Sequence, residues 1–246
     1  MHRFYVKKKQ IQENQIKILG EDVNHICNVL RMKVGKEIVV CDEQGTDYYC
    51  TIHALGKEEV VAEIVSRKDT ETELTGKIYL FQGIPKKDKM DWIVQKAVEL
   101  GVYEIIPVAM KRCVAKIEDG KKERKKIERW QAIANAAAKQ SGRGLIPQIQ
   151  NVCRFPEALE KARELECVII PYEQAECMEK SKKIIADACK TKSVGIFIGP
   201  EGGFDEEEIA LALEKDFQTV TLGKRILRTE TAGMTILSLL MFGMEQ

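Results

Sequence analysis

The chain has 246 residues, of which 44% are hydrophobic and 31% are charged, and its formal net charge is +1. This composition is typical of a soluble globular protein, and the length allows one large domain or two modest ones. No apolar run reaches the length of a membrane span, and the first residues lack the apolar region of a secretion signal, so we expect a cytoplasmic protein without a membrane partner.

The eight cysteines are scattered along the chain, no Cys-x-x-Cys pair occurs, and several cysteines lie within apolar runs. A chain of this length does not need disulfides for stability, so the pattern indicates reduced cytosolic thiols. We therefore expect neither a disulfide framework nor a metal site.

Residues 1 to about 70 have the pattern of a small β-barrel. Short β-rich runs are separated by glycine-containing turns, and the segment 25–31 has the apolar spacing of one or two helical turns. This order predicts a barrel with one inserted helix. The polar segment 68–73 predicts a boundary, so we expect domains at 1–72 and 73–246. The predicted strands cover residues 36–42, 46–54 and 59–65.

After residue 73 the pattern changes to alternating strands and helices, which is typical of a parallel sheet. The predicted strands cover residues 77–82, 104–109, 167–171, 194–198 and 219–222. The predicted helices cover residues 88–100, 121–139, 155–165 and 178–190, with a further helix from residue 230. The first of these helices places Trp92, Ile93, Ala97 and Leu100 on one apolar face.

Positive charge is concentrated in one part of the chain. Residues 77–143 contain 16 basic and 8 acidic side chains. The basic residues in the first turns of the helix over 121–139 are Lys121, Lys122, Arg124, Lys125, Lys126 and Arg129. A basic block in a nearly neutral protein is expected where a phosphate backbone binds, although a solvated helix face has the same composition.

Three glycines occur within residues 199–204 (Gly-Pro-Glu-Gly-Gly-Phe), directly after an apolar run. Glycines let the backbone approach a ligand closely, because no Cβ is in the way. The segment matches neither GxGxxG nor the P-loop. The helix that follows begins with Asp205 as N-cap and Glu208 three residues later, the pattern of a capping box. These carboxylates disfavour a bound phosphate and tolerate a cationic ligand. The alternative is an ordinary strand-to-helix turn without a ligand.

A second glycine-containing loop follows the strand over 219–222 and contains Arg225 and Arg228. Two arginines at such a turn, followed by Thr-Glu-Thr, predict a site that handles an anion. Open sheets bind ligands at the carboxyl ends of their strands, so we expect this loop beside the first one, on a neighbouring strand. The last helix is apolar on almost every side, which predicts burial against more than one neighbour or a second subunit.

The two loops closely resemble the paired C-terminal motifs of the bacterial ribosomal RNA small-subunit methyltransferase E family, which belongs to the trefoil-knotted (SPOUT) methyltransferases. The motifs are residues 198–204, Ile-Gly-Pro-Glu-Gly-Gly-Phe, and residues 222–232, Leu-Gly-Lys-Arg-Ile-Leu-Arg-Thr-Glu-Thr-Ala. The further blocks that resemble this family are residues 2–4, 25–31, 89–101 and 140–143. One departure is Lys139, where the family pattern leads us to expect an acidic residue.

The resemblance implies a mixed α/β fold. An N-terminal PUA-like β-barrel for RNA binding would precede a C-terminal SPOUT-type α/β domain, with a deep C-terminal trefoil knot around a parallel sheet. The resemblance also implies a homodimer that uses S-adenosylmethionine to methylate the N3 atom of one uridine in 16S ribosomal RNA, within the assembled small ribosomal subunit.

For this activity the resemblance implies that strand-end loops hold the cofactor, mostly through backbone groups. The expected cofactor-binding residues are Pro171, Tyr172, Glu173, Ile198, Gly199, Pro200, Glu201, Gly202, Leu222, Gly223, Ile226, Leu227, Arg228, Thr231 and Ala232. Arg228 is the catalytic candidate for holding the uracil oxygens, because guanidinium offers paired donors and stays charged. Glu201 is a candidate proton acceptor, unless it only hydrogen-bonds its own loop. The residues expected to bind RNA phosphates are Arg3, Arg31, Lys86, Lys89, Arg112 and Arg143.

Two other functions stay open from the sequence. A non-enzymatic RNA-binding protein would explain the barrel and the basic block, but not two glycine loops at neighbouring strand ends. A ribose 2′-O-methyltransferase of the same knotted class would share the fold and the cofactor. The Asn-x-Gly-x-x-x-Arg block and the Ser-Leu-Asn segment expected of that branch do not occur in the sequence.

Overall fold

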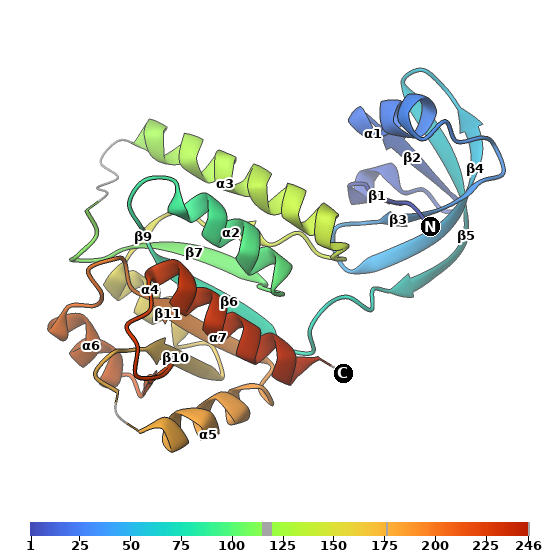
Figure 1. Cartoon of the computed structure of the whole chain (residues 1–246). Coiled ribbons are helices and arrows are strands. Elements are labelled where there is room, and N and C mark those ends of the chain that lie inside the picture. Colours follow the sequence, from blue (N-terminus) through green and yellow to red (C-terminus); the bar gives the residue numbers. More distant parts are fainter. Residues whose placement is uncertain (115–119, 176, 246) are drawn as a thin grey trace. The chain divides into compact units, whose positions relative to one another are not determined.

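The computed structural model describes residues 1–114, 120–175 and 177–245 (Figure 1). Contacts within the chain divide it into two units. One consists of Met1–Glu73 with Ala138–Ile146, and the other of Leu74–Ala137 with Pro147–Gln246. The first unit therefore combines the predicted N-terminal region with a short segment that is distant in sequence. A division into two independent domains at residue 72 stays a prediction.

The first unit is a curled sheet of five strands in the order β1-β3-β4-β5-β2. β1 pairs with β3 in parallel, and the other neighbours are antiparallel. Its elements are β1 (Arg3–Tyr5), a 3-10 turn η1 (Lys8–Gln10), β2 (Gln15–Leu19), α1 (Glu21–Asn24), a π-helical turn η2 (His25–Val29), β3 (Glu37–Cys41), β4 (Thr46–Leu55) and β5 (Glu59–Asp69). The three predicted strands and the inserted helical segment are confirmed. β1 and β2 are not among the predicted elements. β1 has only three residues, whereas the alternation of Ile16 and Ile18 in β2 is a strand signal that the sequence prediction missed.

One apolar core lies inside this curled sheet. Alternate strand residues point inwards, so that Ile16 and Ile18 of β2 and Ile38 of β3 are completely buried. Val23 of α1 and Ile26 of η2 belong to the same core. The inserted helical segment therefore closes the core of the sheet.

Residues 138–146 join the first unit through specific contacts with its sheet. The Tyr5 hydroxyl donates a hydrogen bond to the carbonyl oxygen of Arg143 at 2.8 Å. Arg143 forms an ion pair with Glu73, and its own side chain is only 5% exposed. The ammonium of Lys139 lies 5.7 Å from the centre of the Tyr5 ring. The residue that departs from the family pattern therefore makes a structural contact here.

The second unit is a parallel sheet with helices on both faces. Its strands are β6 (Lys77–Gly83), β7 (Glu104–Ala109), β8 (Gln148–Ile149), β9 (Cys153–Arg154), β10 (Cys167–Pro171), β11 (Ser193–Ile198) and β12 (Gln218–Val220). Its helices are α2 (Lys89–Glu99), α3 (Gly120–Ser141), α4 (Phe155–Ala162), α5 (Met178–Ala188), α6 (Glu206–Leu213) and α7 (Thr229–Met244). The last turn of α3 is part of the first unit. The predicted alternation of strands and helices is confirmed.

The strand order of this sheet is β12-β10-β11-β6-β7-β8, with β9 also pairing β7. All of its neighbours are parallel. The chain begins at β6 in the middle, runs outwards through β7 and β8, and returns to build β10, β11 and β12 on the other side. Open α/β sheets bind ligands where the strand order reverses, outside the carboxyl ends of the strands.

Helices cover the two faces of the sheet differently. The rings of Phe81 and Phe197 stack at a centroid distance of 4.4 Å on the face that α4 and α6 cover. On the opposite face α7 lies between α2 and α5 and also contacts β11 (Figure 1). The predicted burial of α7 against more than one neighbour is therefore confirmed. Its surface still includes Leu239 and Phe242, which are 46% and 82% exposed.

Trp92 differs from the predicted pattern of α2. Ile93 and Ala97 are completely buried as predicted, but Trp92 is 45% exposed. Successive residues lie about 100° apart around a helix, so Trp92 cannot share the buried position of its neighbour.

No helix within the described ranges is long and apolar enough to span a membrane. The described residues also contain no group of three or more His, Cys, Asp and Glu side chains that could hold a metal ion. The trefoil knot implied by the resemblance stays a prediction.

Candidate functional site

The candidate site lies at the carboxyl ends of three strands of the second unit. β10 pairs with β11 on one side and with β12 on the other. Residues 199–204 follow β11, residues 221–228 follow β12, and β10 ends at Pro171. The expectation that the two loops follow neighbouring strands is therefore wrong. They flank a third strand, whose end supplies the middle of the site.

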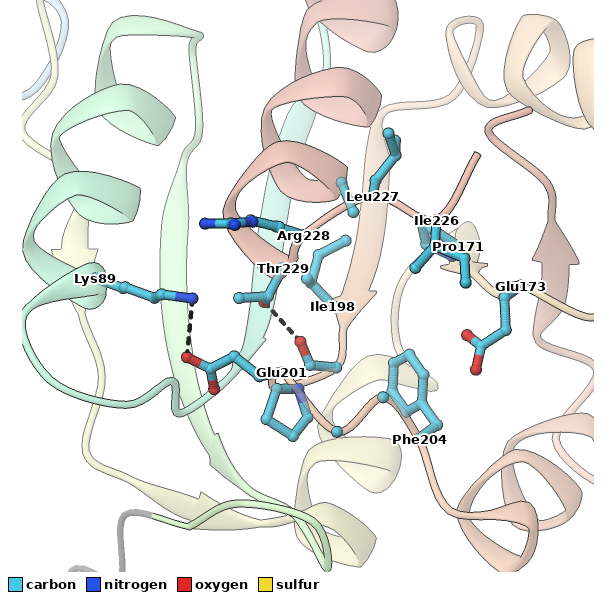
Figure 2. A pocket seen from close by; sticks show the side chains of 15 residues that line it. Lys89, Pro171, Glu173, Ile198, Glu201, Phe204, Ile226, Leu227, Arg228 and Thr229 are labelled. Carbon is cyan, nitrogen blue, oxygen red and sulfur yellow. Dashed lines mark hydrogen bonds and ion pairs between the residues drawn. The ribbon is translucent and has the colours of Figure 1, made fainter. Parts of the chain in front are cut away.

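A cavity of about 440 Å³ opens at these strand ends, a volume within the range of small-molecule sites. It is lined by Lys89, Pro171, Glu173, Ile198, Gly199, Pro200, Glu201, Gly202, Gly203, Phe204, Ile226, Leu227, Arg228, Thr229 and Ala232 (Figure 2). A smaller cavity of about 90 Å³ adjoins it, and the residues that line both are Pro171, Glu173, Ile226, Leu227 and Ala232. We call them the larger and the smaller cavity.

Together the two cavities contain every residue predicted to bind the cofactor except Thr231. Tyr172, Leu222 and Gly223 line only the smaller cavity. Thr231 is exposed on the first turn of α7. Successive residues of a helix point in directions about 100° apart, so Ala232 lines both cavities although Thr231, the residue before it, does not. The binding roles of these residues stay predictions.

A buried chain of hydrogen bonds ties the first loop to the start of α7. Gln82 Nε2 donates to Thr229 Oγ1 at 3.0 Å, and Thr229 Oγ1 donates to the carbonyl oxygen of Gly199 at 2.6 Å. Gln82 is completely buried and Thr229 is 6% exposed. Buried polar groups are costly unless they are paired, so this chain favours one arrangement of the three segments. Neither Gln82 nor Thr229 is among the predicted site residues, although a glutamine in an apolar strand is a signal of such a network.

The first loop has no room for a side chain at Gly199. A Cβ there would lie 3.1 Å from the carbonyl carbon of Gly203 and 3.3 Å from the ring of Phe204. Gly203 has a φ of +68°, which L side chains rarely adopt. The loop therefore folds closely on itself, and at its glycines only backbone lines the cavity.

The predicted capping box after this loop is confirmed. The Asp205 carboxylate accepts a hydrogen bond from the N–H of Glu207 at 3.3 Å, and the Glu208 carboxylate accepts one from the N–H of Asp205 at 2.9 Å. Glu208 also accepts a hydrogen bond from the N–H of Lys111 at 2.9 Å. Carboxylates of the chain itself thus occupy the N-terminus of α6, which disfavours a phosphate there.

Lys89 links two carboxylates at the larger cavity. Its Nζ lies 3.1 Å from Glu201 Oε1 and 3.3 Å from Glu230 Oε2. The interaction with Glu201 raises the pKa of Lys89, so the ammonium stays protonated. Burial raises the pKa of Glu201, but hydrogen bonds from its own N–H, from Lys89 and from the N–H of Lys86 outweigh burial and lower it. Glu201 is therefore an ionised carboxylate and a weaker base than an ordinary glutamate.

Arg228 is the N-cap residue of α7 and lines the larger cavity. Its side chain is exposed, and its guanidinium makes no hydrogen bond or ion pair with another residue of the described part of the chain. It extends to the same side of the first loop as the Lys89 ammonium (Figure 2). Arg225 lines only the smaller cavity. The second cation of the larger cavity is therefore Lys89 rather than the predicted Arg225.

Several basic side chains of the second unit are exposed. On α3 they are Lys121, Lys122, Arg124, Lys125, Lys126 and Arg129, of which Arg129 pairs with Asp88 and Asp91. Of the predicted RNA-binding residues, those that are exposed are Arg31, Lys86 and Arg112. Arg112 also donates a hydrogen bond to the carbonyl oxygen of Gly202 at 3.1 Å, which braces the first loop.

The other predicted RNA-binding residues have structural partners. Arg143 is 4% exposed and paired with Glu73, so the prediction that it contacts phosphate is wrong, because a phosphate cannot reach a buried guanidinium. Arg3 forms an ion pair with Asp47, and its side chain is 20% exposed. Lys89 lies at the larger cavity, where two carboxylates hold it.

Comparisons with known proteins bear on this site. Residues 72–241 match a family model described as RNA methyltransferase domain, and residues 18–65 match one described as RNA methyltransferase PUA domain. The chain is 37% identical to the ribosomal RNA small subunit methyltransferase E of Bacillus subtilis (strain 168), over 100% of this chain and 98% of the relative. It is 36% identical to the protein of the same name from Mesomycoplasma hyopneumoniae (strain 232), over 97% of this chain and 98% of the relative.

A solved structure is also similar along almost the whole chain. The crystal structure of a ribosomal RNA small subunit methyltransferase E from Neisseria gonorrhoeae, bound to S-adenosyl methionine, is 34% identical. The two folds superpose with a TM-score of 0.81 over 97% of this chain and 95% of that one.

Proposed function

This chain belongs to the ribosomal RNA small subunit methyltransferase E family, and from that premise we propose that it methylates 16S ribosomal RNA with S-adenosylmethionine as methyl donor. We further propose that the acceptor is the N3 atom of one uridine, reached in the assembled small ribosomal subunit. The observation that carries the proposal is the larger cavity, where a glycine loop and two cations meet at the carboxyl ends of parallel strands.

The two cavities fit S-adenosylmethionine in size, lining and charge. Their combined lining is mostly apolar side chains and glycine backbone, which can cover an adenosine and offer N–H and C=O groups to its polar atoms. The Glu173 carboxylate on the shared wall complements a cation. Asp205 and Glu208 occupy the helix N-terminus where a phosphate-bearing cofactor would bind. When bound, S-adenosylmethionine supplies an electrophilic methyl group on a positively charged sulfur.

Methylation at uridine N3 requires cations that stabilise negative charge on the base. Uridine N3 carries a proton and lies between two carbonyl groups, so negative charge develops on the ring oxygens when that proton leaves. Arg228 lines the larger cavity and its guanidinium has no partner among the described residues, so its donors are available for such an oxygen. Preorganised donors aimed at developing charge are among the strongest contributions to catalysis. We assign this role to Arg228.

Glu201 is better suited to positioning than to proton transfer. Its lowered pKa weakens it as a base. Its carboxylate accepts the N–H of Lys86 at 3.1 Å and pairs with Lys89, so it joins the glycine loop to the start of α2. We propose that Glu201 holds these segments in place and that it is not the proton acceptor.

The exposed basic face of α3 is the surface we propose for ribosomal RNA phosphates, together with Arg31, Lys86 and Arg112. We also propose that the protein is a homodimer. Leu239 and Phe242 give α7 an exposed apolar surface, and a second subunit would cover it.

The experiment that tests the proposed function is nucleoside analysis of 16S ribosomal RNA from a strain that lacks this protein. Loss of 3-methyluridine, restored by the gene, is expected. Loss of a 2′-O-methylated nucleoside would instead favour the ribose methyltransferase. A full complement of methylated nucleosides, together with no S-adenosylmethionine binding in calorimetry, would favour the non-enzymatic RNA-binding protein.

A further inference from the structure

A third cavity, of about 250 Å³, lies next to the larger one and is lined by Lys89, Trp92 and Glu230. Lys89 lines both cavities, and Glu230 directly follows Thr229 of the larger cavity at the start of α7. We call it the tryptophan cavity. It is too small for a second cofactor and large enough for one nucleobase. It therefore offers a place for a flat group directly beside the larger cavity.

Trp92 forms an exposed aromatic wall of this cavity. Its neighbours Ile93 and Val94 on α2 are completely buried, whereas Trp92 is 45% exposed. Tryptophan buries a large apolar area when it is covered, so an exposed ring beside a cavity is suited to a partner. Nucleobases stack on such rings in proteins that bind single-stranded RNA or unstacked bases.

Lys89 places a fixed positive charge between the two cavities. Glu201 and Glu230 hold its ammonium from two sides, at 3.1 and 3.3 Å. Glu230 Oε2 is hidden from solvent and lies 3.3 Å from the Lys89 ammonium, so the ion pair with Lys89 compensates for the burial of this oxygen. Two carboxylates fix the position of this ammonium. An ammonium has three N–H donors, so one donor is left for a third partner.

Arg228 supplies a second cation on the same side of the first loop (Figure 2). The target ring of a uridine has two carbonyl oxygens, one on each side of N3. Two cations at the same cavity can each donate to one of these oxygens. Cytosine has an amino group in place of one of these oxygens, and its N–H donors would face a cation.

We propose that the tryptophan cavity receives the target uracil, stacked on Trp92, with one ring oxygen on the Lys89 ammonium and the other on the Arg228 guanidinium. This proposal rests on the proposed function, and it adds the position of the acceptor base and the choice of uracil over cytosine. Glu201 and Glu230 are positioning residues for Lys89. The base must leave its helix to reach the cavity, as in other enzymes that modify bases.

Fluorescence tests the stack without any methyl transfer. The probe is a pentaribonucleotide with one central uridine, compared with the same strand carrying an abasic site, both added to protein saturated with S-adenosylhomocysteine. The uridine strand is expected to quench wild-type emission and the abasic strand is not. Trp92→Phe should abolish the quenching but retain affinity for the strand. Trp92→Ala should weaken binding roughly 5- to 150-fold, the range for loss of one base–aromatic stack. Equal quenching by both strands, or Trp92→Ala with wild-type affinity, would overturn the stack.

Single-turnover methylation of small ribosomal subunits tests Lys89. Lys89→Met keeps the aliphatic stem and removes the charge, and the rate is expected to fall about a hundred- to a thousandfold, as for removal of one donor to a developing oxyanion. Lys89→Arg should recover part of the rate. The matched control is Lys96→Met on the same helix, because Lys96 pairs with Glu99 and is not among the described residues that line the three cavities. If Lys89→Met lowers cofactor affinity as much as the rate, Lys89 serves to hold the glycine loop, and its proposed contact with the base is overturned.

Two further measurements separate this proposal from its rivals. Wild-type protein that neither binds S-adenosylmethionine nor methylates the subunit would refute the proposed function itself. If the wild type does both, and Trp92→Ala changes the sedimentation coefficient but not RNA affinity, Trp92 belongs to a subunit contact and the base-binding proposal fails alone.

Discussion

The Thr229 hydroxyl donates a hydrogen bond of 2.6 Å to the carbonyl oxygen of Gly199, and this contact joins the first residue of α7 to the glycine loop after β11. Both groups are buried, and Gln82 donates to the same hydroxyl from the end of β6. Three segments that are distant in sequence therefore meet at one side chain. The shape of the larger cavity depends on that meeting.

Thr229→Ala is expected to lower the free energy of unfolding by about 1–3 kcal/mol, because the buried carbonyl of Gly199 loses its partner. S-adenosylmethionine affinity should fall as well, since the loop is no longer held. Thr229→Ser keeps the hydroxyl and should restore most of both. Urea denaturation and calorimetry measure the two effects. Thr235→Ala is the control and should change neither, because the Thr235 hydroxyl donates to the carbonyl oxygen of Thr231 within α7 itself.

Gly199→Ala is expected to weaken S-adenosylmethionine binding about 5- to 150-fold. A Cβ at this position would lie 3.1 Å from Gly203, and relieving such overpacking costs about 1–3 kcal/mol. Gly120→Ala is the matched control, because a Cβ there meets nothing within 4 Å. Calorimetry on folded protein measures both variants. Unchanged affinity of Gly199→Ala would remove this loop from the cofactor site.

Arg228→Ala is expected to slow methyl transfer about a hundred- to a thousandfold while stability and cofactor affinity stay close to wild type. The guanidinium makes no hydrogen bond or ion pair with another described residue, so its removal breaks no polar interaction in the described part of the fold. Arg228→Lys keeps the charge but loses the planar pair of donors, and partial activity would show that charge alone contributes. Single-turnover rates with saturating cofactor and ribosomal subunits decide the matter. Equal rates for Arg228→Ala and wild type would contradict the catalytic role.

Phe242→Asp is expected to convert a dimer to a monomer, since Phe242 is 82% exposed on α7 and Leu239 lies one turn away. Leu240, although equally apolar, is completely buried within the chain, and Leu240→Asp should unfold the protein instead. Leu213→Asp on α6, where the side chain is 51% exposed, is the control for an added surface charge. Sedimentation velocity measures the outcome. A wild-type monomer that is fully active at nanomolar concentration would rule out the shared interface.

Lys125→Ala is expected to lower the dependence of RNA affinity on salt by slightly less than one unit of logarithmic slope, because one phosphate contact releases about one counterion. Cofactor affinity should not change. Lys182→Ala on α5 removes a lysine that is also exposed but lies outside the basic face of α3, and it should leave the slope as it is. Filter binding to small ribosomal subunits over a series of salt concentrations measures the slope. The same slope for wild type and Lys125→Ala would exclude α3 from the RNA surface.

Local patterns predicted the parts of the site that lie close together in sequence. The capping box of Asp205 and Glu208 joins residues three apart, so its geometry follows from the helix itself. The glycines of residues 199–204 predicted a close backbone turn. The cofactor residues named from the two loop motifs line the two cavities, apart from Thr231. The motif alone does not show which way the Thr231 side chain points on α7.

The sequence also determined the class of the fold, through strand and helix periodicity, and its family, through the two loop motifs. Tertiary structure alone decided which groups meet. The placement of β10 between β11 and β12 follows from sheet order, which no local pattern encodes. Arg143 has the residue type of a surface position, but in the fold it is buried and paired with Glu73, which lies 70 residues away in the sequence. Lys89 reaches Glu201 and Glu230 only when α2, the first loop and α7 pack together, because side chains far apart in sequence become neighbours through long-range packing alone.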